Sequence, residues 1–565
     1  MSAPVSPPPA RWTWAVFAAC LLLSVIHLTT SGALDSDLAG DPDEAAHAVT
    51  ALMLRDYFAG GWLQPPMRFA TAYYADFPKV ALGHYPPGWY LLGGLWLLPW
   101  VSIKSLLILQ AVYLAALGAL LCRLASKFTS LPAAAVAGLL VAAMPLTLKQ
   151  SQFVMSDLLL ACLCLLSVFA WACYLHEPTV RRALSFGFIA TAAILTKGSA
   201  LGLCAVPIVA TILTRRWALL ARVSWWLSAL PVALSAGPWM LYSSRITAEG
   251  MSHQSLGAFL QEAAAFYATA LPEVLGWLFA LLALAGLGGL LQLSGRNSRH
   301  AGLAAALWGL LVGMAAIMLL VPAGTTTRYL LPLLPALLLA AVLTADRMCA
   351  TLSTLRWPVF LLLVAGGFAC VAQWPEKHVS GFSAAVMRVG IPHPQPDARS
   401  ESWLVVSDPR GEGAIIAAAA FACGQRSPSP LRVCRGSKEL ASSDWLGRGY
   451  QPAFSTAPEL LRHLDTLRVS HVFLDLSVPE EKRLPHDRLL HAALQSAGPL
   501  WRLDFQQPVS RIHGETGLLW VYARTQPPPA APAQRGPASA ALHHRTPLPP
   551  TPCHFAAAPG IDSTL

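Results

Sequence analysis

The chain has 565 residues, of which 55% are hydrophobic and only 12% are charged, and its formal net charge is +10. Because soluble domains carry about 25% charged residues, this composition excludes an ordinary water-soluble protein and indicates a surface that largely faces lipid. The basic excess does not indicate nucleic-acid binding. In the first two thirds of the chain the basic residues fall in short loops between apolar runs, where they mark the cytoplasmic side of a membrane.

Apolar runs recur along the first 373 residues, and each roughly approaches the 20 residues that a membrane-spanning helix needs. They cover residues 12–30, 104–122, 131–148, 158–175, 223–243, 266–293, 301–322, 328–345 and 357–373. Residues 183–214 are long enough for two shorter helices, with a break predicted at Thr196-Lys197-Gly198. The first run could be a signal peptide, but its apolar core exceeds roughly 7–15 residues, so we interpret it as a retained anchor.

Charged loops predict the orientation of these spans, since lysine and arginine favour the cytoplasm. The basic loops lie at Arg11, Arg123 with Lys127, Arg181 with Arg182, Arg215 with Arg216 and Arg222, Arg296 with Arg299, and Arg347 with Arg356. Placing all of them inside predicts about eleven crossings, a cytoplasmic N-terminus and an external C-terminal part. Residues 86–100 must then stay outside. They are short, proline-flanked and tryptophan-rich, which favours a helix in the outer membrane interface.

The external loops of this topology collect the polar residues. The first loop spans residues 31–103 and contains, among others, Lys79 and His84. The second lies near residues 149–157, and the break at Lys197 also faces outward. We therefore expect the chemistry to lie on the outer side of the membrane.

The C-terminal part changes composition from about residue 374. Runs at 403–406 and 471–474 predict strands, and 413–422 and 457–468 predict helices, which indicates a small α/β domain over 401–525. Residues 526–565 are rich in Pro, Ala and Ser and predict a disordered tail. Cys423 and Cys434 could form a disulfide if this part is periplasmic, or stay free.

The sharpest local motif is Asp41-Pro42-Asp43-Glu44-Ala45-Ala46-His47. Asp41 and Pro42 suit a helix start. On the following helix Asp43 and His47 are four residues apart and share a face, with Glu44 beside them. Acidic residues at a helix start usually serve only as caps or compensate the helix dipole, so this motif alone leaves both interpretations open.

Three further ionisable residues occur at the ends of apolar runs. Asp157 could cap an ordinary span or face a cavity, since such groups are costly at membrane depth. Lys197 could extend toward the lipid headgroups, but Gly198 beside it favours a broken helix that lines a cavity. Arg328 begins another span. Together these groups suit a reaction in which a carboxylate removes a proton from a hydroxyl and cations hold a leaving phosphate.

Five segments, in order over roughly residues 12–350, resemble the GT-C superfamily of membrane glycosyltransferases, nearest the family 39 group of protein O-mannosyltransferases and lipid A aminoarabinose transferases. The segments are 43–47, 84–90 (His-Tyr-Pro-Pro-Gly-Trp-Tyr), 151–157, 195–198 and 328–332. The resemblance implies an inverting transfer from a polyprenyl-phosphate sugar outside the cytoplasmic membrane.

The resemblance also implies roles for single residues. Asp43 would be the catalytic base, with Glu44 and Asp157 as further catalytic carboxylates. Substrate binding would fall to His47, His84, Tyr85, Lys197, Arg328 and Tyr329, with Lys197 and Arg328 as the candidates for the donor phosphate. His47 or His84 with Glu44 could bind a divalent metal, but no ligand spacing demands one, so we expect no cofactor.

Two departures from the family leave the sugar and the acceptor open. His47 stands where a tyrosine or another residue often follows the Asp-Glu pair. Pro86 and Pro87 differ from the aminoarabinose enzymes, which tend to carry a lysine before a single proline. The acceptor is therefore expected to be a lipid, a glycan or a protein.

The predicted fold class is a polytopic α-helical membrane protein of the GT-C type with a C-terminal periplasmic α/β domain, in a bacterial inner membrane. Its expected domains are a catalytic transmembrane domain (1–373), the α/β domain (374–525) and the tail. A transporter or lipid flippase is the alternative, but we find no internal repeat, and the charges occur in a long external loop. A non-catalytic scaffold is the third option, which the order of the motifs disfavours.

Overall fold

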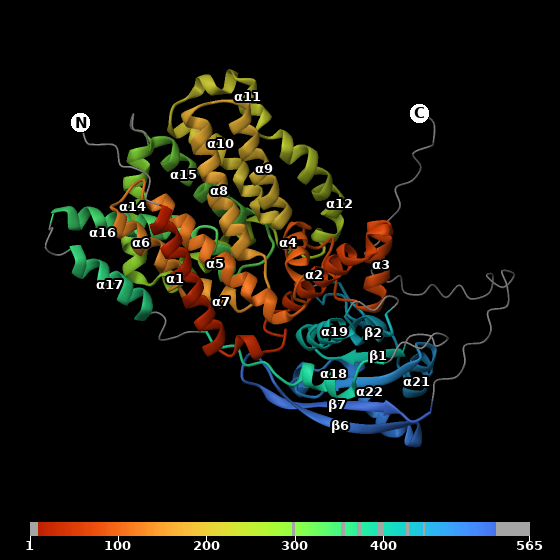
Figure 1. The fold of residues 1–565 in the computed structure, drawn as a ribbon. Coiled ribbons are helices and arrows are strands. Elements are labelled where there is room, and N and C mark those ends of the chain that lie inside the picture. The colour runs from red at the N-terminus through yellow and green to blue at the C-terminus, as the bar shows by residue number, and fades with distance from the viewer. Residues whose placement is uncertain are drawn as a thin grey trace, which may run out of the picture. The chain divides into compact units, whose positions relative to one another are not determined.

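A computed structural model describes residues 10–295, 300–351, 356–369, 375–392, 401–424, 429–444 and 447–526. The expected disordered tail thus falls, beyond residue 526, outside the described residues. The chain forms two compact units (Figure 1). The first, called here the helical unit, joins Met1–Asp35, His84–Trp96 and Ile103–Lys377. The second, called the α/β unit, joins Ser36–Gly83, Leu97–Ser102 and His378–Leu565.

Membrane-spanning helices dominate the helical unit. Among the described residues, five helices are long and apolar enough to cross a membrane, namely α1 (Ala10–Thr30), α5 (Ile103–Ala125), α8 (Asp157–His176), α14 (Trp277–Ser294) and α15 (Ala301–Leu320). A sixth span is possible if α6 (Leu131–Val141) and α7 (Pro145–Ser151), which are bent by 51°, cross together. The chain is therefore a multi-pass membrane protein, and the count of about eleven crossings is not confirmed.

Several of the other apolar runs are broken into short helices. The predicted break at Lys197 is confirmed: α9 (Val180–Thr196) ends there in extended backbone, and a 3-10 helix, η3 (Gly198–Cys204), leads into α10 (Ala205–Leu213). The run 266–293 contains one span-length helix, α14, and the end of the helix before it. Gly276, with φ of 77°, separates α13 (Leu256–Leu275) from α14, because a left-handed backbone ends a helix.

The remaining elements of the helical unit are mostly short or irregular, and α16 is the longest of them. They are η1 (Ala33–Asp35), α4 (Gly88–Leu97), η4 (Trp217–Ala221), α11 (Val223–Leu227), a π-helical turn η5 (Val232–Ala236), α12 (Gly237–Ala248), η6 (Thr327–Leu330), α16 (Leu334–Thr351) and α17 (Arg356–Ala369). The ten residues of α4 span about 15 Å at 1.5 Å per residue, half of a bilayer core. This length agrees with the interpretation of residues 86–100 as a segment that does not cross.

The α/β unit is built on a five-stranded sheet of order β2-β1-β5-β7-β6. Strands β1 (Glu401–Val406), β2 (Leu431–Arg435) and β5 (Val469–Asp475) are parallel, and β7 (Thr516–Arg524) is antiparallel to β5 and β6 (Trp501–Ser510). Both predicted strands and both predicted helices, α19 (Pro409–Cys423) and α21 (Ala457–Thr466), are present. The α/β domain is therefore confirmed, while the hairpin β6–β7 and α22 (Pro485–Ser496) are additional.

Residues of the first long loop belong to the same unit as this sheet. Helix α2 (Glu44–Ala59) packs against α19, and α3 (Pro66–Asp76) packs against β2, as Figure 1 shows within this unit. Asp37 accepts hydrogen bonds from the backbone N–H groups of Phe382 (2.9 Å) and Ser383 (3.3 Å), and thereby caps α18 (Phe382–Val389). The loop is thus anchored to the C-terminal residues at both its beginning and its middle.

Candidate active site

The acidic motif of the first loop lies at the start of α2. The sequence allowed its acidic residues to be ordinary helix caps, and the geometry differs from that interpretation. The helix begins at Glu44, after a turn in which the Asp41 carboxylate accepts from the Asp43 N–H at 2.9 Å. Asp43 occupies the N-cap position, yet its side chain makes no capping hydrogen bond. The Asp43 carboxylate is therefore not used to cap α2, which weakens the purely structural interpretation of this residue.

Glu44 and His47 are both buried, at 0% and 1% exposure. Glu44 accepts from the Gly40 N–H at 3.2 Å, so at least one oxygen of this carboxylate stabilises the turn that precedes the helix. His47 lies one turn after Asp43, and its N–H donates to the Asp43 carbonyl at 2.9 Å. The shared helical face expected for Asp43 and His47 is therefore present.

Lys79 was noted in the first loop but was not given a role. Only 9% exposed, it donates from Nζ to the carbonyl of Pro409, in the first turn of α19, at 3.2 Å. A methyl group at Gly413 would lie 2.9 Å from Cε of Lys79 and 3.0 Å from Cβ of Ala45. Glycine at position 413 therefore leaves room for the Lys79 side chain and for Ala45 of α2 beside α19.

Two further carboxylates of the first loop lie in the α/β unit. Asp56 forms a 2.7 Å ion pair with Arg55, and burial raises its pKa although Arg55 opposes the shift. Burial also raises the pKa of Asp76 from 3.8 to about 6, an effect that Arg432 on β2 only partly opposes. Asp76 is therefore held in an environment that favours its neutral form.

Replacing Asp76 by asparagine is expected to stabilise the folded protein at pH 7.5. A folded-state pKa above the unfolded value means that the ionised form costs stability, and this cost appears as pH rises from about 4 through about 6. Two pKa units correspond to at most about 3 kcal/mol, and we expect about 1–2 kcal/mol after solvent screening. The difference in unfolding free energy between Asp76→Asn and the wild type is measured by thermal unfolding at pH 4 and pH 7.5.

The same comparison for Asp504→Asn serves as the control, because Asp504 pairs with Arg502 at the surface. That variant should leave the unfolding midpoint nearly unchanged at both pH values. An Asp76→Asn midpoint at or below that of the wild type at pH 7.5 would contradict the assignment.

In the helical unit, Asp157 and Lys197 form a buried ion pair. Asp157 begins α8 and Lys197 follows α9, and Oδ1 and Nζ are 2.7 Å apart with side-chain exposures of 2% and 8%. The second oxygen of Asp157 is buried and accepts no hydrogen bond within the described part of the chain. The break after α9 thus places the ammonium group at the carboxylate instead of at the lipid headgroups.

Arg328 and Tyr329 lie on η6, close to this pair. Nζ of Lys197 is 5.1 Å from the centre of the Tyr329 ring, and the guanidinium of Arg328 is 5.8 Å from the same centre. Both distances fall within the range of cation–π attraction. The aromatic ring therefore lies near two cations that the sequence placed 131 positions apart.

The segment 84–90, which contains His84 and Tyr85, lies next to the end of α9, just before Lys197. A Cβ atom at Gly88 would lie 2.7 Å from the carbonyl oxygen of Leu195, so the start of α4 packs directly on the end of α9. Gly88 is the residue of this segment that permits the contact, because any side chain there would collide with the backbone.

A second polar cluster, around residues 152–155 before α8, was not predicted. Nε2 of Gln152 lies 3.0 Å from Nε2 of His27 on α1, and Nζ of Lys377 donates to the Gln152 carbonyl at 3.2 Å. The Lys377 side chain is fully buried. Gln110 donates a further hydrogen bond to the Met155 carbonyl at 2.9 Å. These bonds fix residues 152–155, and hence the start of α8 at Asp157. No motif or composition in the sequence indicated that Lys377 would be buried here.

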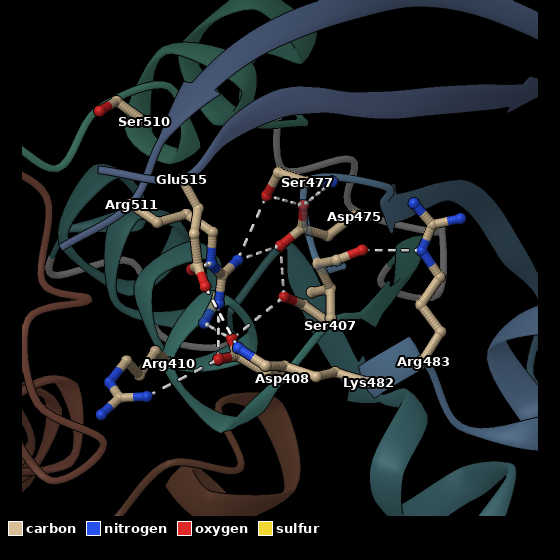
Figure 2. Close-up of polar contacts among 12 residues, drawn as sticks. Ser407, Asp408, Arg410, Asp475, Ser477, Lys482, Arg483, Ser510, Arg511 and Glu515 are labelled. Atoms are coloured by element: carbon tan, nitrogen blue, oxygen red, sulfur yellow. Dashed lines mark hydrogen bonds and ion pairs between the residues drawn. The ribbon is translucent and has the colours of Figure 1, made fainter. Parts of the chain in front are cut away.

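A third polar cluster lies in the α/β unit at the carboxyl ends of β1 and β5 (Figure 2). Arg511 is only 8% exposed and contacts Asp408 at 2.5 Å, Asp475 at 2.8 Å and Glu515 at 3.6 Å. Burial opposes ionisation of Asp408, but the nearby Arg511 holds its pKa below the usual value. Ser407 and Ser477 complete the bonds to Asp475. Arg511 therefore links the β6–β7 turn to the carboxylates Asp408 and Asp475 at the ends of the parallel strands.

Cys423 and Cys434 are both buried and are not joined to each other, so the disulfide considered from the sequence is not present. Burial raises the pKa of Cys434 to about 12, which keeps this thiol neutral. Among the described residues there is also no group of three or more His, Cys, Asp or Glu side chains arranged to hold a metal ion.

The predicted site residues therefore fall into two groups. The helical unit contains Asp157, Lys197, Arg328, Tyr329, His84 and Tyr85. The α/β unit contains Asp43, Glu44 and His47. Spanning helices, a broken helix with a buried ion pair, and a mixed sheet with helices define a multi-pass membrane protein that carries an α/β domain.

Comparison with solved structures places this fold. The oligosaccharyltransferase of Archaeoglobus fulgidus in the apo form matches with a TM-score of 0.51 at 13% identity, over 91% of this chain and 74% of that chain. Its complex with zinc and sulfate gives 0.50 at 14% identity, over 89% and 72%. ArnT of Cupriavidus metallidurans bound to undecaprenyl phosphate gives 0.43 at 16% identity, over 74% and 77%.

The oligosaccharyltransferase is a member of the GT-C superfamily, so the GT-C-like fold expected from the sequence is confirmed. At these identities the likeness concerns the fold alone. No protein-family model matches the chain, and no curated protein matches its sequence.

Proposed function

We propose that this protein is an inverting glycosyltransferase that moves a sugar from a polyprenyl-phosphate donor to a lipid, glycan or protein acceptor at the periplasmic face of a bacterial inner membrane. One observation carries the proposal. Four segments that are far apart in sequence and resemble GT-C motifs, 84–90, 151–157, 195–198 and 328–332, all meet around Lys197 in the helical unit. The GT-C fold supports the same class of reaction.

In the proposed reaction the Asp43 carboxylate removes the proton of an acceptor hydroxyl. The resulting oxygen attacks the anomeric carbon of the donor as the bond from that carbon to the phosphate oxygen breaks. Polyprenyl phosphate leaves with the bonding electron pair. This single displacement inverts the configuration at the anomeric carbon. Glu44 is assigned as a further catalytic carboxylate, and His47, His84 and Tyr85 are assigned to substrate binding.

Lys197 and Arg328 would stabilise the phosphate as negative charge develops on it. Asp157 is assigned a supporting role: by pairing with Lys197 at 2.7 Å, it fixes the direction of the ammonium group. The Tyr329 ring, which lies near both cations, would limit their motion. No step of this proposal needs a metal ion.

The test is a reconstitution in proteoliposomes with a radiolabelled polyprenyl-phosphate sugar and an extract of bacterial envelope acceptors. Label recovered in a new glycolipid, glycan or glycoprotein, together with free polyprenyl phosphate, supports the proposal. Intact donor that only changes leaflet would identify a flippase and overturn it. Mass spectra of envelope glycolipids and glycoproteins from cells with and without the protein would then identify the acceptor.

A further inference from the structure

We propose that a cavity at the carboxyl ends of β1 and β5 is an acceptor subsite, which binds one uncharged sugar ring of a glycan. This inference rests on the proposed function, because it narrows the acceptor of that reaction to a glycan. Neither the sequence motifs nor the comparisons assign a ligand to this cavity, which lies wholly within the α/β unit.

The cavity lies where the topology of the sheet favours a ligand. Strand β1 lies between β2 and β5, so the chain leaves β1 toward one side and later returns to β5 on the other. Ligands of open α/β sheets bind outside the carboxyl ends of the strands at such a point. Asp408 follows β1, Val478 follows β5, and both line the cavity, whose volume is about 130 Å³. Because a cavity of about 150 Å³ holds benzene, this volume suits one six-membered ring.

The wall of the cavity offers both hydrogen-bond donors and hydrogen-bond acceptors. The charged side chains that line it are the cations Arg410, Lys482 and Arg511 and the carboxylates Asp408 and Glu515 (Figure 2). Arg511 is also bonded to Asp475 at 2.8 Å, so three positive charges face three negative ones. A phosphate or carboxylate group would lie against the two lining carboxylates and be repelled. A sugar hydroxyl can donate to a carboxylate and accept from a cation, so an uncharged ring fits this wall better.

Two of the cations have hydrogen-bonding capacity to spare. Nε of Arg410 is buried and, among the residues that the structure describes, has no hydrogen-bond partner. Nη1 of Arg410 is 4.0 Å from an oxygen of Asp408 that Arg511 already contacts at 2.5 Å. Lys482 is 63% exposed and contacts Glu515 at 3.2 Å, which leaves further donors on its ammonium group. Since a buried donor without a partner costs free energy, a hydroxyl that accepts from Arg410 would stabilise the site.

The rest of the wall is apolar and connects the cavity to the proposed base. Ala39 and Phe382 contribute to it, and the C–H face of a sugar ring can pack against such side chains. Asp43 follows Ala39 by four residues, which span at most about 14 Å. The Gly40 N–H is bonded to Glu44 at 3.2 Å, so this connection is held by the turn before α2. A short glycan with one ring in the cavity could therefore extend to Asp43.

The experiment measures binding of methyl glucoside, methyl mannoside and methyl N-acetylglucosaminide to the full chain by saturation-transfer difference NMR. The protein is held in lipid nanodiscs, because maltoside detergents would compete for a sugar site. At least one glycoside should bind, and Arg410→Met and Lys482→Met should each weaken it by about 10-fold, since each removes a charged hydrogen-bond donor. Arg502→Met is the matched control at a 71% exposed arginine of the same unit, and it should bind like the wild type.

The outcomes separate the subsite from the proposed function. The inference is overturned if no glycoside binds, if the two variants bind like Arg502→Met, or if inorganic phosphate displaces the glycosides, which would identify an anion site. If Arg410→Met does not fold, Lys482→Met decides, because its side chain is mostly exposed. In the transfer assay both variants should raise the KM for the envelope acceptor about 10-fold more than the KM for the donor. Glycoside binding by a wild type that transfers no sugar would overturn the proposed function and leave only a sugar site.

Discussion

Asp43→Asn is expected to lower the rate of sugar transfer by about 10²- to 10⁴-fold, the usual contribution of a general base. The amide has nearly the shape of the carboxylate but cannot accept the proton of the acceptor hydroxyl. Because the Asp43 side chain does not cap α2, the substitution should leave membrane insertion and the thermal unfolding midpoint close to those of the wild type. Transfer is measured in proteoliposomes at saturating donor.

Asp41→Asn is the matched control, since Asp41 lies two residues away in the same turn. Its carboxylate accepts from the Asp43 N–H at 2.9 Å, so its role is to hold the turn. An amide oxygen can accept the same hydrogen bond, and we expect at most a several-fold loss of activity. Normal transfer by Asp43→Asn would exclude Asp43 as the base, and equal losses in both variants would indicate a structural role for the whole turn.

The largest effect on stability is expected from breaking the Asp157–Lys197 pair. Lys197→Met leaves a carboxylate with 2% exposure without its cation, and removal of one partner of a buried pair typically costs about 3–5 kcal/mol. Asp157→Asn should cost less, because an asparagine oxygen can still accept from the ammonium group. Thermal unfolding in detergent, followed for both single variants and the double variant, measures the coupling.

The double variant Asp157→Asn with Lys197→Met separates stability from activity. It removes both charges, so we expect it to recover much of the unfolding free energy lost by Lys197→Met. It should remain inactive, because Lys197 is also the proposed ligand of the donor phosphate. Full recovery of transfer would contradict that assignment.

The exposed pair Lys104–Asp35 provides the matched control for this experiment. Its Nζ and Oδ1 atoms are also 2.7 Å apart, but the side chains are 53% and 81% exposed. Lys104→Met should therefore cost less than about 1 kcal/mol. Equal costs for Lys104→Met and Lys197→Met would show that burial does not strengthen the pair in the helical unit.

Local sequence rules accounted for much of the secondary structure and for part of the site. Apolar runs located α1, α5, α8 and α15, because the length of such a run is set by the bilayer. Lys197 followed by Gly198 located the break after α9, because both residues disfavour an uninterrupted helix in lipid. The β6–β7 hairpin was missed although β6 alternates buried and exposed residues, since its apolar positions are widely spaced.

What the sequence by itself determined is the class of protein, the break at Lys197 and the residue types available for chemistry. The tertiary structure decided which of those residues meet: Asp157 with Lys197, and Lys79 beside the first turns of α2 and α19. The physical reason is that patterns of charge and hydropathy report only on a few neighbouring residues. How the helices pack decides whether two residues 40 positions apart form an ion pair. It also decides whether a lysine bonds a carbonyl 330 positions away. Small residues such as Gly88 and Gly413 permit that packing, and a single sequence does not indicate which surface approaches them.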